Sequence, residues 1–341
     1  KVTKIHNKGD LIQKLTTDAQ GNTISNELFL GKYKVVETKA PSDLTIGKTE
    51  QERTHEVTLS YKGQSVELSE SQTDYKNERP KIDLYAEKKS ATEKNVTLQG
   101  ATFQLCAGEN IKNYMGEVVL EKDKVIETVV SGQDGKASFT ADIPIGHTYY
   151  IKESLAPEKY YKSDEIFTFQ YTYKDDKTYV YEHHGEFSNE EVRGTVHVNK
   201  IDKETDAYQS QGDAILDGAV YGLYAKNDIV HPNKKTGVVY KAGELVDQKV
   251  IKDGKADFTD LYLGEYYVQE IEPPEGYLLD STKYPVSVPY EGQEVKVVER
   301  NVTVKEQVKK QAFQLIKISE DGDQTEVDLV EGAGFRIYLL K

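Results

Sequence analysis

Residues 263–277 read LGEYYVQEIEPPEGY, and this stretch decides the fold because two variants of it occur earlier in the chain. The variants are LGKYKVVETKAP at 30–41 and IGHTYYIKESLAP at 145–157. Each has a glycine, a run rich in aromatic and aliphatic residues, and a glutamate that is followed four residues later by a proline. Alternating apolar and polar residues are typical of a β-strand with one buried face. The recurrence predicts a repeated all-β domain.

The spacing of further motifs gives the length of the repeat. The glutamates Glu37, Glu153 and Glu270 are separated by 116 and 117 residues. A turn with Asp and Gly precedes each of them, and such turns between strand-like runs predict β-hairpins. These turns are DAQGN (18–22), QDGKASF (133–139) and KDGKADF (252–258). A third motif opens the repeats as QGATFQL (99–105), DGAVYGLY (217–224) and EGAGFRIY (331–338).

These markers divide the 341 residues into four parts. Residues 1–79 are expected to be the later part of one repeat, whose opening strands precede residue 1. Two complete repeats follow at 80–192 and 193–309, and 310–341 opens a further one. The segments are short and strand-like, with Gly, Asn and Asp turns, and none has a sustained helical period. We therefore expect tandem immunoglobulin-like β-sandwiches, arranged as an elongated, monomeric rod.

Composition excludes several classes of function. The net charge is −14 with both signs interspersed, whereas nucleic-acid binding needs a clustered basic surface. No run of 18 apolar residues is present, so no membrane span is predicted in these residues. The single cysteine, Cys106, excludes a disulfide within the chain. His183 and His184 are adjacent and point to opposite faces of a strand, so no metal site is predicted.

One set of polar residues recurs in both complete repeats. Each repeat has a lysine in phase with the apolar face of its first strand, a glutamate on a central strand and an asparagine near its last strand. The two sets are Lys88, Glu153 and Asn189, and Lys200, Glu270 and Asn301. Burial of isolated charges is costly, but it favours an uncharged amine and a protonated carboxyl group. The amine could then attack the amide carbon, with the glutamate moving protons, and expel ammonia.

A simpler interpretation is open for any one repeat. Such a lysine can extend its amine into water, the glutamate can be half-exposed, and the asparagine can form a turn. Recurrence of the whole set favours the covalent interpretation. In the repeat at 193–309, the position that matches Asn189 is Glu306, which has no amide. Asn301 is chosen as the acceptor because it is in phase with Val295 and Val297.

The ordered motifs, from the opening lysine and GAxFxLY to the DG hairpin, LGxYYxxExxxP and the final asparagine, resemble the collagen-adhesin B-type domains. These are also called SpaA-type or prealbumin-like domains of Gram-positive pilins and adhesins. The resemblance covers essentially the whole chain. It implies a seven-stranded sandwich with an intramolecular Lys–Asn isopeptide bond that a glutamate assists.

The resemblance assigns roles to individual residues. Lys88 is implied to bond Asn189 with help from Glu153, and Lys200 to bond Asn301 with help from Glu270. The segment that contains Glu37 is similar to the E-box of pilins. Asn77 would be the acceptor of the first repeat and Lys317 the lysine of the last. Within residues 1–341, neither is expected to have its bonding partner.

The function implied is a structural stalk of a cell-wall-anchored, extracellular Gram-positive protein, cross-linked by its own single-turnover reaction and not an enzyme. No cofactor is expected, and the immediate partners are neighbouring repeats of the same chain. Two alternatives remain open: an adhesin module that binds host matrix protein or glycan, and an accessory module of a larger secreted enzyme.

Overall fold

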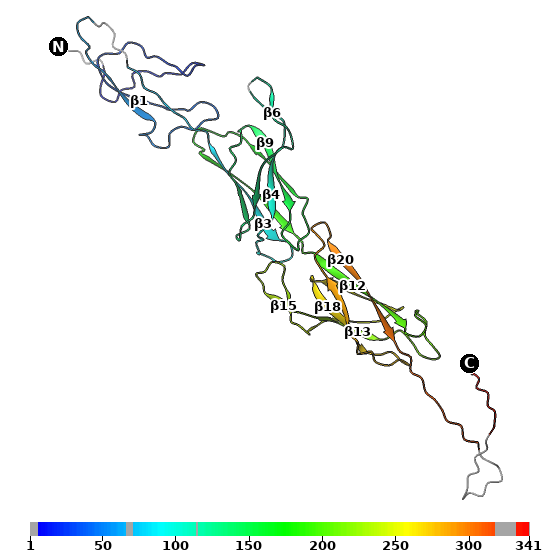
Figure 1. Cartoon of the computed structure of the whole chain (residues 1–341). Coiled ribbons are helices and arrows are strands. Elements are labelled where there is room, and N and C mark those ends of the chain that lie inside the picture. The colour runs from blue at the N-terminus through cyan, green and yellow to red at the C-terminus, as the bar shows by residue number, and fades with distance from the viewer. Residues whose placement is uncertain (1–5, 66–70, 114, 318–331, 341) are drawn as a thin grey trace. The chain divides into compact units, whose positions relative to one another are not determined.

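A computed structural model describes residues 6–65, 71–113, 115–317 and 332–340 (Figure 1). The chain divides into two compact units. The first unit comprises Lys1–Pro157 and Ser163–Asn189, and the second comprises Glu158–Lys162 and Glu190–Lys341. Each unit contains one complete β-sandwich.

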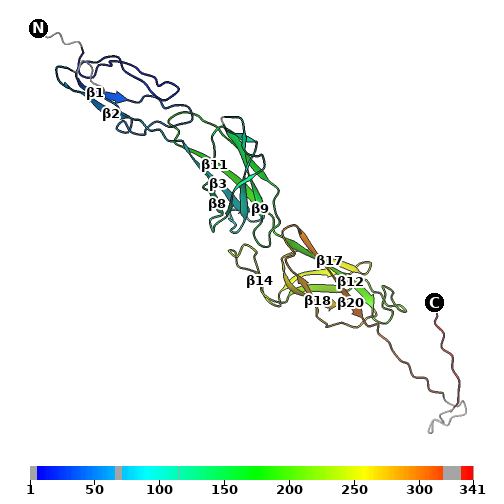
Figure 2. The same ribbon diagram turned by 45° about the horizontal axis from the view of Figure 1, so that its top comes forward.

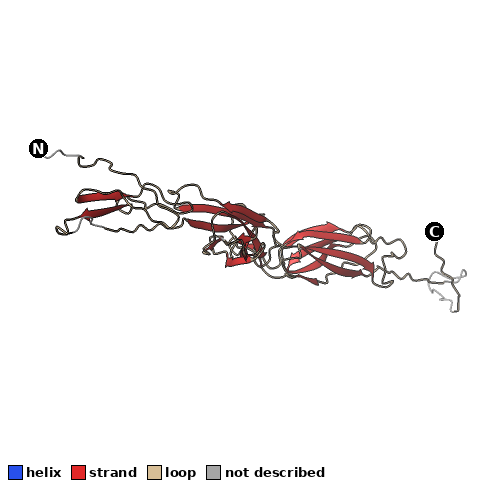
Figure 3. Ribbon diagram, turned by 90° about the horizontal axis from the view of Figure 1, so that it is seen from above, coloured by secondary structure: helices blue, strands red, loops and turns tan. Residues whose placement is uncertain are grey.

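All regular structure in the described residues is β-strand (Figure 3). This confirms the predicted all-β class. Within these residues no helix is long and apolar enough to cross a membrane.

The first unit begins with a two-stranded antiparallel sheet of β1 (Gly31–Val36) and β2 (Thr54–Leu59). Its sandwich has a four-stranded sheet, a three-stranded sheet and a small hairpin. In spatial order, the four-stranded sheet is β10 (Ile166–Tyr171), β9 (His147–Leu155), β4 (Thr102–Ala107) and β7 (Val125–Val130). The three-stranded sheet is β11 (Val180–Asn189), β3 (Lys81–Ser90) and β8 (Lys136–Phe139). The hairpin pairs β5 (Ile111–Lys112) with β6 (Val118–Leu120).

The second unit repeats this topology (Figure 2). Its four-stranded sheet is β16 (Leu245–Val250), β13 (Val220–Ala225), β18 (Gly264–Glu272) and β19 (Tyr284–Val288). Its three-stranded sheet is β17 (Lys255–Leu261), β12 (Arg193–Asp202) and β20 (Val297–Glu306). The small hairpin pairs β14 (Ile229–Val230) with β15 (Val238–Tyr240).

The first and last strands of each sandwich are parallel neighbours. In the first unit β3 pairs with β11, and Lys88 lies opposite Phe187. In the second unit β12 pairs with β20, and Lys200 lies opposite Val304. Residues two positions apart on a strand point to the same face. The side chains two residues beyond these partners, at 189 and 306, therefore point to the same face as the two lysines.

Alternation of apolar residues builds each core. Phe103 and Leu105 on β4 are fully buried against Tyr149 and Ile151 on β9. The second unit buries the equivalent side chains of β13 and β18 in its own core. At the turn between β16 and β17, Asp253 and Gly254 both have positive φ, and Lys252 and Lys255 exchange backbone hydrogen bonds. The tight turn expected from the DG motif is present, but the predicted hairpin is wrong, because β16 pairs with β13 in one sheet and β17 pairs with β12 in the other.

Candidate functional site

The site in the first unit joins three buried polar side chains from three strands. Lys88 (β3), Glu153 (β9) and Asn189 (β11) are 0, 3 and 1% exposed. The Lys88 Nζ lies 3.0 Å from Glu153 Oε1, and Asn189 Nδ2 donates to Glu153 Oε2 at 2.8 Å. The backbone N–H of Ser163 also donates to Glu153 Oε2, at 2.9 Å. One carboxyl group thus contacts both the amine and the amide nitrogen.

Burial sets the electrostatics of this site. Desolvation lowers the pKa of Lys88, and the nearby Glu153 opposes that shift. The Nζ also lies 5.8 Å from the centre of the Phe103 ring, which closes one side of the site. Phe103 is the cross-strand neighbour of Glu153, so the same pair of strands positions both side chains. A lower amine pKa increases the fraction of Lys88 that is nucleophilic.

The second unit has a similar site with a different acceptor. Lys200 Nζ lies 2.7 Å from Glu306 Oε2, and Tyr221 Oη donates to Glu306 Oε1 at 2.7 Å. Lys200 and Glu306 are 1 and 0% exposed. Glu270 accepts the backbone N–H of Asp280 at 2.7 Å, as Glu153 accepts that of Ser163. Burial and the hydrogen bond to Glu306 raise the pKa of Glu270 to about 8, and burial lowers the pKa of Lys200.

The choice of Asn301 as acceptor is contradicted by this geometry. Asn301 lies opposite His197 and is exposed, whereas Val302, Val304 and Glu306 occupy the buried face of β20. The phase was wrong because β20 starts at Val297, which is 45% exposed, and Val298 is the first buried residue of the strand. Val295 and Val297 are apolar, but they do not belong to the buried face of β20.

The remaining predicted residues lie outside complete sites. Asn77 Nδ2 donates to Glu37 Oε2 at 3.1 Å and to the Thr45 carbonyl oxygen at 3.1 Å. The glutamate and the amide of the first repeat are therefore already in contact. Lys317 is exposed and lies outside any strand of the described residues.

Comparison with known proteins identifies the domain. A model of the SpaA prealbumin-like fold domain matches residues 1–72, 84–184 and 194–303. The chain belongs to the SpaA prealbumin-like family. Sequence comparison with curated proteins gives no match.

One solved structure supports the fold of these SpaA domains, and two pilins are also similar in sequence. The TIE protein of Bacillus anthracis is 22% identical with a TM-score of 0.55, over 86% of this chain and 45% of that protein. The chain thus spans less than half of that protein's length. The minor pilin GBS52 of Streptococcus agalactiae is 16% identical over 69% of this chain and all of the pilin, with a TM-score of 0.26. The shaft pilin SpaA of Lactobacillus rhamnosus GG is 12% identical over 68% of this chain and 98% of the pilin, with a TM-score of 0.26.

Two functional side chains of the second SpaA domain were missed by sequence reasoning. Glu306 occupies the acceptor position, and Tyr221 holds its carboxylate. A signal for Glu306 existed, since it follows Glu270 by 36 residues just as Asn189 follows Glu153. Asn301 was nevertheless predicted as the acceptor, because the reaction needs an amide and Glu306 has none. Tyr221 is the counterpart of Phe103. A role for its hydroxyl group could be recognised only once Glu306 was known to be its hydrogen-bond partner.

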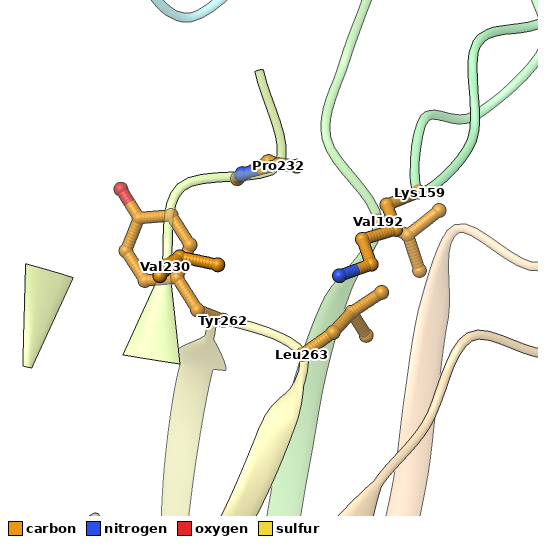
Figure 4. Close-up of a pocket in the computed structure, with 6 residues that line it drawn as sticks. All are labelled: Lys159, Val192, Val230, Pro232, Tyr262 and Leu263. Atoms are coloured by element: carbon orange, nitrogen blue, oxygen red, sulfur yellow. The ribbon is translucent and has the colours of Figure 1, made fainter. Parts of the chain in front are cut away.

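A hollow in the second SpaA domain is too small for an organic ligand. It is lined by Lys159, Val192, Val230, Pro232, Tyr262 and Leu263 (Figure 4). Its volume is about 10 Å³, enough for about one water molecule. Pockets for small molecules are typically some 300–1,000 Å³. This hollow is therefore too small to hold a small molecule.

Proposed function

We propose that this chain is a load-bearing stalk segment of a Gram-positive surface protein, and that its first complete SpaA domain is locked by an isopeptide bond between Lys88 and Asn189. The observation that carries this is the placement of one carboxyl group, that of Glu153, against both reacting nitrogens in a site closed to solvent. Family membership and the absence of any cysteine besides Cys106 support the same function.

The geometry supports a proton-transfer role for Glu153. Its Oε1 can accept a proton from the Lys88 amine, whose Nζ then forms a bond to Asn189 Cγ. Its Oε2 can deliver a proton to Asn189 Nδ2 as the Cγ–Nδ2 bond breaks. The products are a secondary amide and one ammonia, so atoms and charge balance without a cofactor. Proton transfer by a positioned side chain is worth about 10²–10⁴-fold in rate.

The position of the bond suits a protein under tension. It connects the first strand of the sandwich to the last residue of the last strand, Asn189. Force that enters through β3 and leaves after β11 then passes through covalent bonds instead of the hydrogen bonds between the strands. By analogy with a disulfide across a loop of about 100 residues, the bond stabilises the domain by about 4–5 kcal/mol.

Intact-mass spectrometry of the full chain tests this proposal. We expect the chain to be lighter than its sequence by at least one ammonia, with a cross-linked peptide that contains Lys88 and Asn189. Glu153→Ala should restore the mass of the sequence at this site, because no group remains to carry the protons. A wild-type chain whose Lys88 and Asn189 peptides are recovered separately would overturn the proposal.

A further inference from the structure

The two buried sites differ at two positions, and in the second site the residues at these positions contact each other. Phe103 on β4 and Tyr221 on β13 are equivalent, because each pairs across the sheet with the central glutamate, Glu153 or Glu270. The acceptor position also differs, with Asn189 in the first site and Glu306 in the second. The Tyr221 hydroxyl group, which Phe103 lacks, donates to Glu306 Oε1 at 2.7 Å. The aromatic residue and the acceptor therefore both differ between the two sites.

Both carboxyl oxygens of Glu306 face hydrogen-bond donors. The Lys200 Nζ lies 2.7 Å from Glu306 Oε2, and the Tyr221 hydroxyl group donates a hydrogen bond to Glu306 Oε1. Glu270 also hydrogen-bonds Glu306 and thus supplies a third donor when protonated. Hydrogen bonds to a charged acceptor stabilise the charge. A carboxylate held in this way is a poor electrophile, because attack by an amine would place a second negative charge on its oxygens.

The central glutamate is also placed differently in the two sites. In the first site, Glu153 contacts both Lys88 and the nitrogen that leaves. In the second, the acceptor itself contacts the lysine, and Glu270 is hydrogen-bonded to that acceptor. Condensation of Lys200 with Glu306 would have to release one water from a paired ammonium and carboxylate. Glu270 can donate a proton to Glu306, but Lys200 contacts Glu306 and not Glu270, so the group that could protonate the leaving oxygen is not the one that contacts the amine.

We propose that Tyr221 and Glu306 form a matched pair that keeps the second SpaA domain free of a cross-link, with a buried Lys200–Glu306 ion pair in place of an amide bond. Glu306 determines the chemistry of the site, and Tyr221 is a positioning residue that holds its carboxylate. The inference rests on the proposed function of the first site for its contrast, but it concerns different residues. The chain thus combines one covalently locked domain with one that is closed only by non-covalent contacts.

Peptide mapping of the full wild-type chain gives the first test. We expect the Lys200 and Glu306 peptides to be recovered separately and at full mass, while the Lys88 and Asn189 peptides are joined. A Lys200–Glu306 cross-link with loss of one water would overturn the inference, whatever the result at the first site. A first site without a cross-link would instead count against the proposed function, and it is read from different peptides.

Conversion of the second site gives the second test. Tyr221→Phe with Glu306→Asn reproduces the Phe103 and Asn189 pair of the first site, and we expect the chain to lose one additional ammonia through a Lys200 cross-link. The matched control is Tyr221→Phe with Glu306→Ala, which offers no amide and should lose none. A double variant that melts cooperatively but gains no cross-link, in a chain whose first site is cross-linked, would overturn the inference.

The role of Tyr221 has its own readout. Tyr221→Phe should lower the melting temperature of the second domain when Glu306 is present, because a buried carboxylate loses a donor. In the Glu306→Asn background the same change should leave the melting temperature unchanged or raise it. Equal decreases in both backgrounds would show that Tyr221 acts only through packing and would remove it from the matched pair.

Discussion

The two complete domains place a lysine and a glutamate in the same way, yet they differ in what the lysine contacts. In each domain the lysine lies on the first strand and the acceptor lies two residues beyond the lysine's partner on the last strand. The central glutamate accepts a backbone N–H from the residue ten positions later in both. The difference is an amide at 189 and a carboxylate at 306. The fold therefore positions the same groups in both domains, and under the proposed chemistry one side chain decides whether an amide is available to react.

The difference also shows two ways to bury an amine. Removing a charge from water is expensive, and a buried ion pair often contributes little net stability. The first domain can remove the charge by converting the amine into an amide. The second can keep the charge by pairing it with Glu306, whose carboxyl group is also contacted by Tyr221 and Glu270. We expect the first solution to be permanent and the second to respond to force and to pH.

Force should separate the two domains most clearly. When the full chain is pulled by its ends, strands 193–306 of the second domain should unravel and release on the order of 350–400 Å, at about 3.4 Å per residue. The first domain should release only about 25 Å, because the bond at Lys88 shields the residues that follow it up to Asn189. Single-molecule force spectroscopy measures both lengths.

A variant of the first domain that cannot form the bond should behave like the second domain under force. Glu153→Gln keeps the size of the side chain but cannot exchange a proton, so the first domain should then also unravel by several hundred ångströms. The release from the second domain should be unchanged. Full-length release from the wild-type first domain would contradict the covalent lock.

Loss of the acceptor amide should have the next largest effect. Asn189→Ala removes the electrophile and should lower the free energy of unfolding of the first domain by about 4–5 kcal/mol, the value expected for closing a loop of about 100 residues. Asn301→Ala is the matched control, because Asn301 is an exposed amide on the equivalent strand of the second domain. Changes at exposed sites of this kind are usually within about 0.5 kcal/mol. Chemical denaturation with proteolytic readout of each unit measures both, and similar losses for the two variants would contradict the site assignment.

Much of the fold was predictable because it is encoded locally. Alternation in the LGxYY stretches indicates strands with one buried face, and the spacing of Glu153 and Glu270 indicates a repeat. The burial of Lys88 followed from its phase with Leu84 and Ala86 on the same strand. These features depend only on the two-residue period of a strand, which a sequence displays directly.

The acceptor of the second site was not predictable in the same way. Its position depends on the register between β12 and β20, which are about 100 residues apart, and on where β20 begins. Phase counted from Val295 crosses the start of the strand and selects the wrong face. The link between Tyr221 and Glu306 spans 85 residues and two sheets, so no local pattern expresses it.

The stability of the second domain should change gradually with pH. Burial and Glu306 raise the pKa of Glu270 from its ordinary 4.5 to about 8, so between these values the folded domain holds a proton that the unfolded chain has lost. Its stability should therefore fall as the pH rises from about 4.5 to about 8, by at most about 1.4 kcal/mol per pH unit for one proton. The groups that face Glu270 are Lys200 on β12, Glu306 on β20 and Tyr221 on β13.

The Lys200 contribution has the opposite sign, because a lowered amine pKa makes the folded state lose its proton first. Glu270→Gln distinguishes the two contributions. It removes the decrease in stability with rising pH that Glu270 causes and leaves the contribution of Lys200. Urea unfolding at a series of pH values, followed through fragments of the second unit, measures the slope. A wild-type slope that matches the Glu270→Gln slope would show that Glu270 is ionised in the folded domain, and the second site would then hold two carboxylates around one amine instead of one proton shared between them.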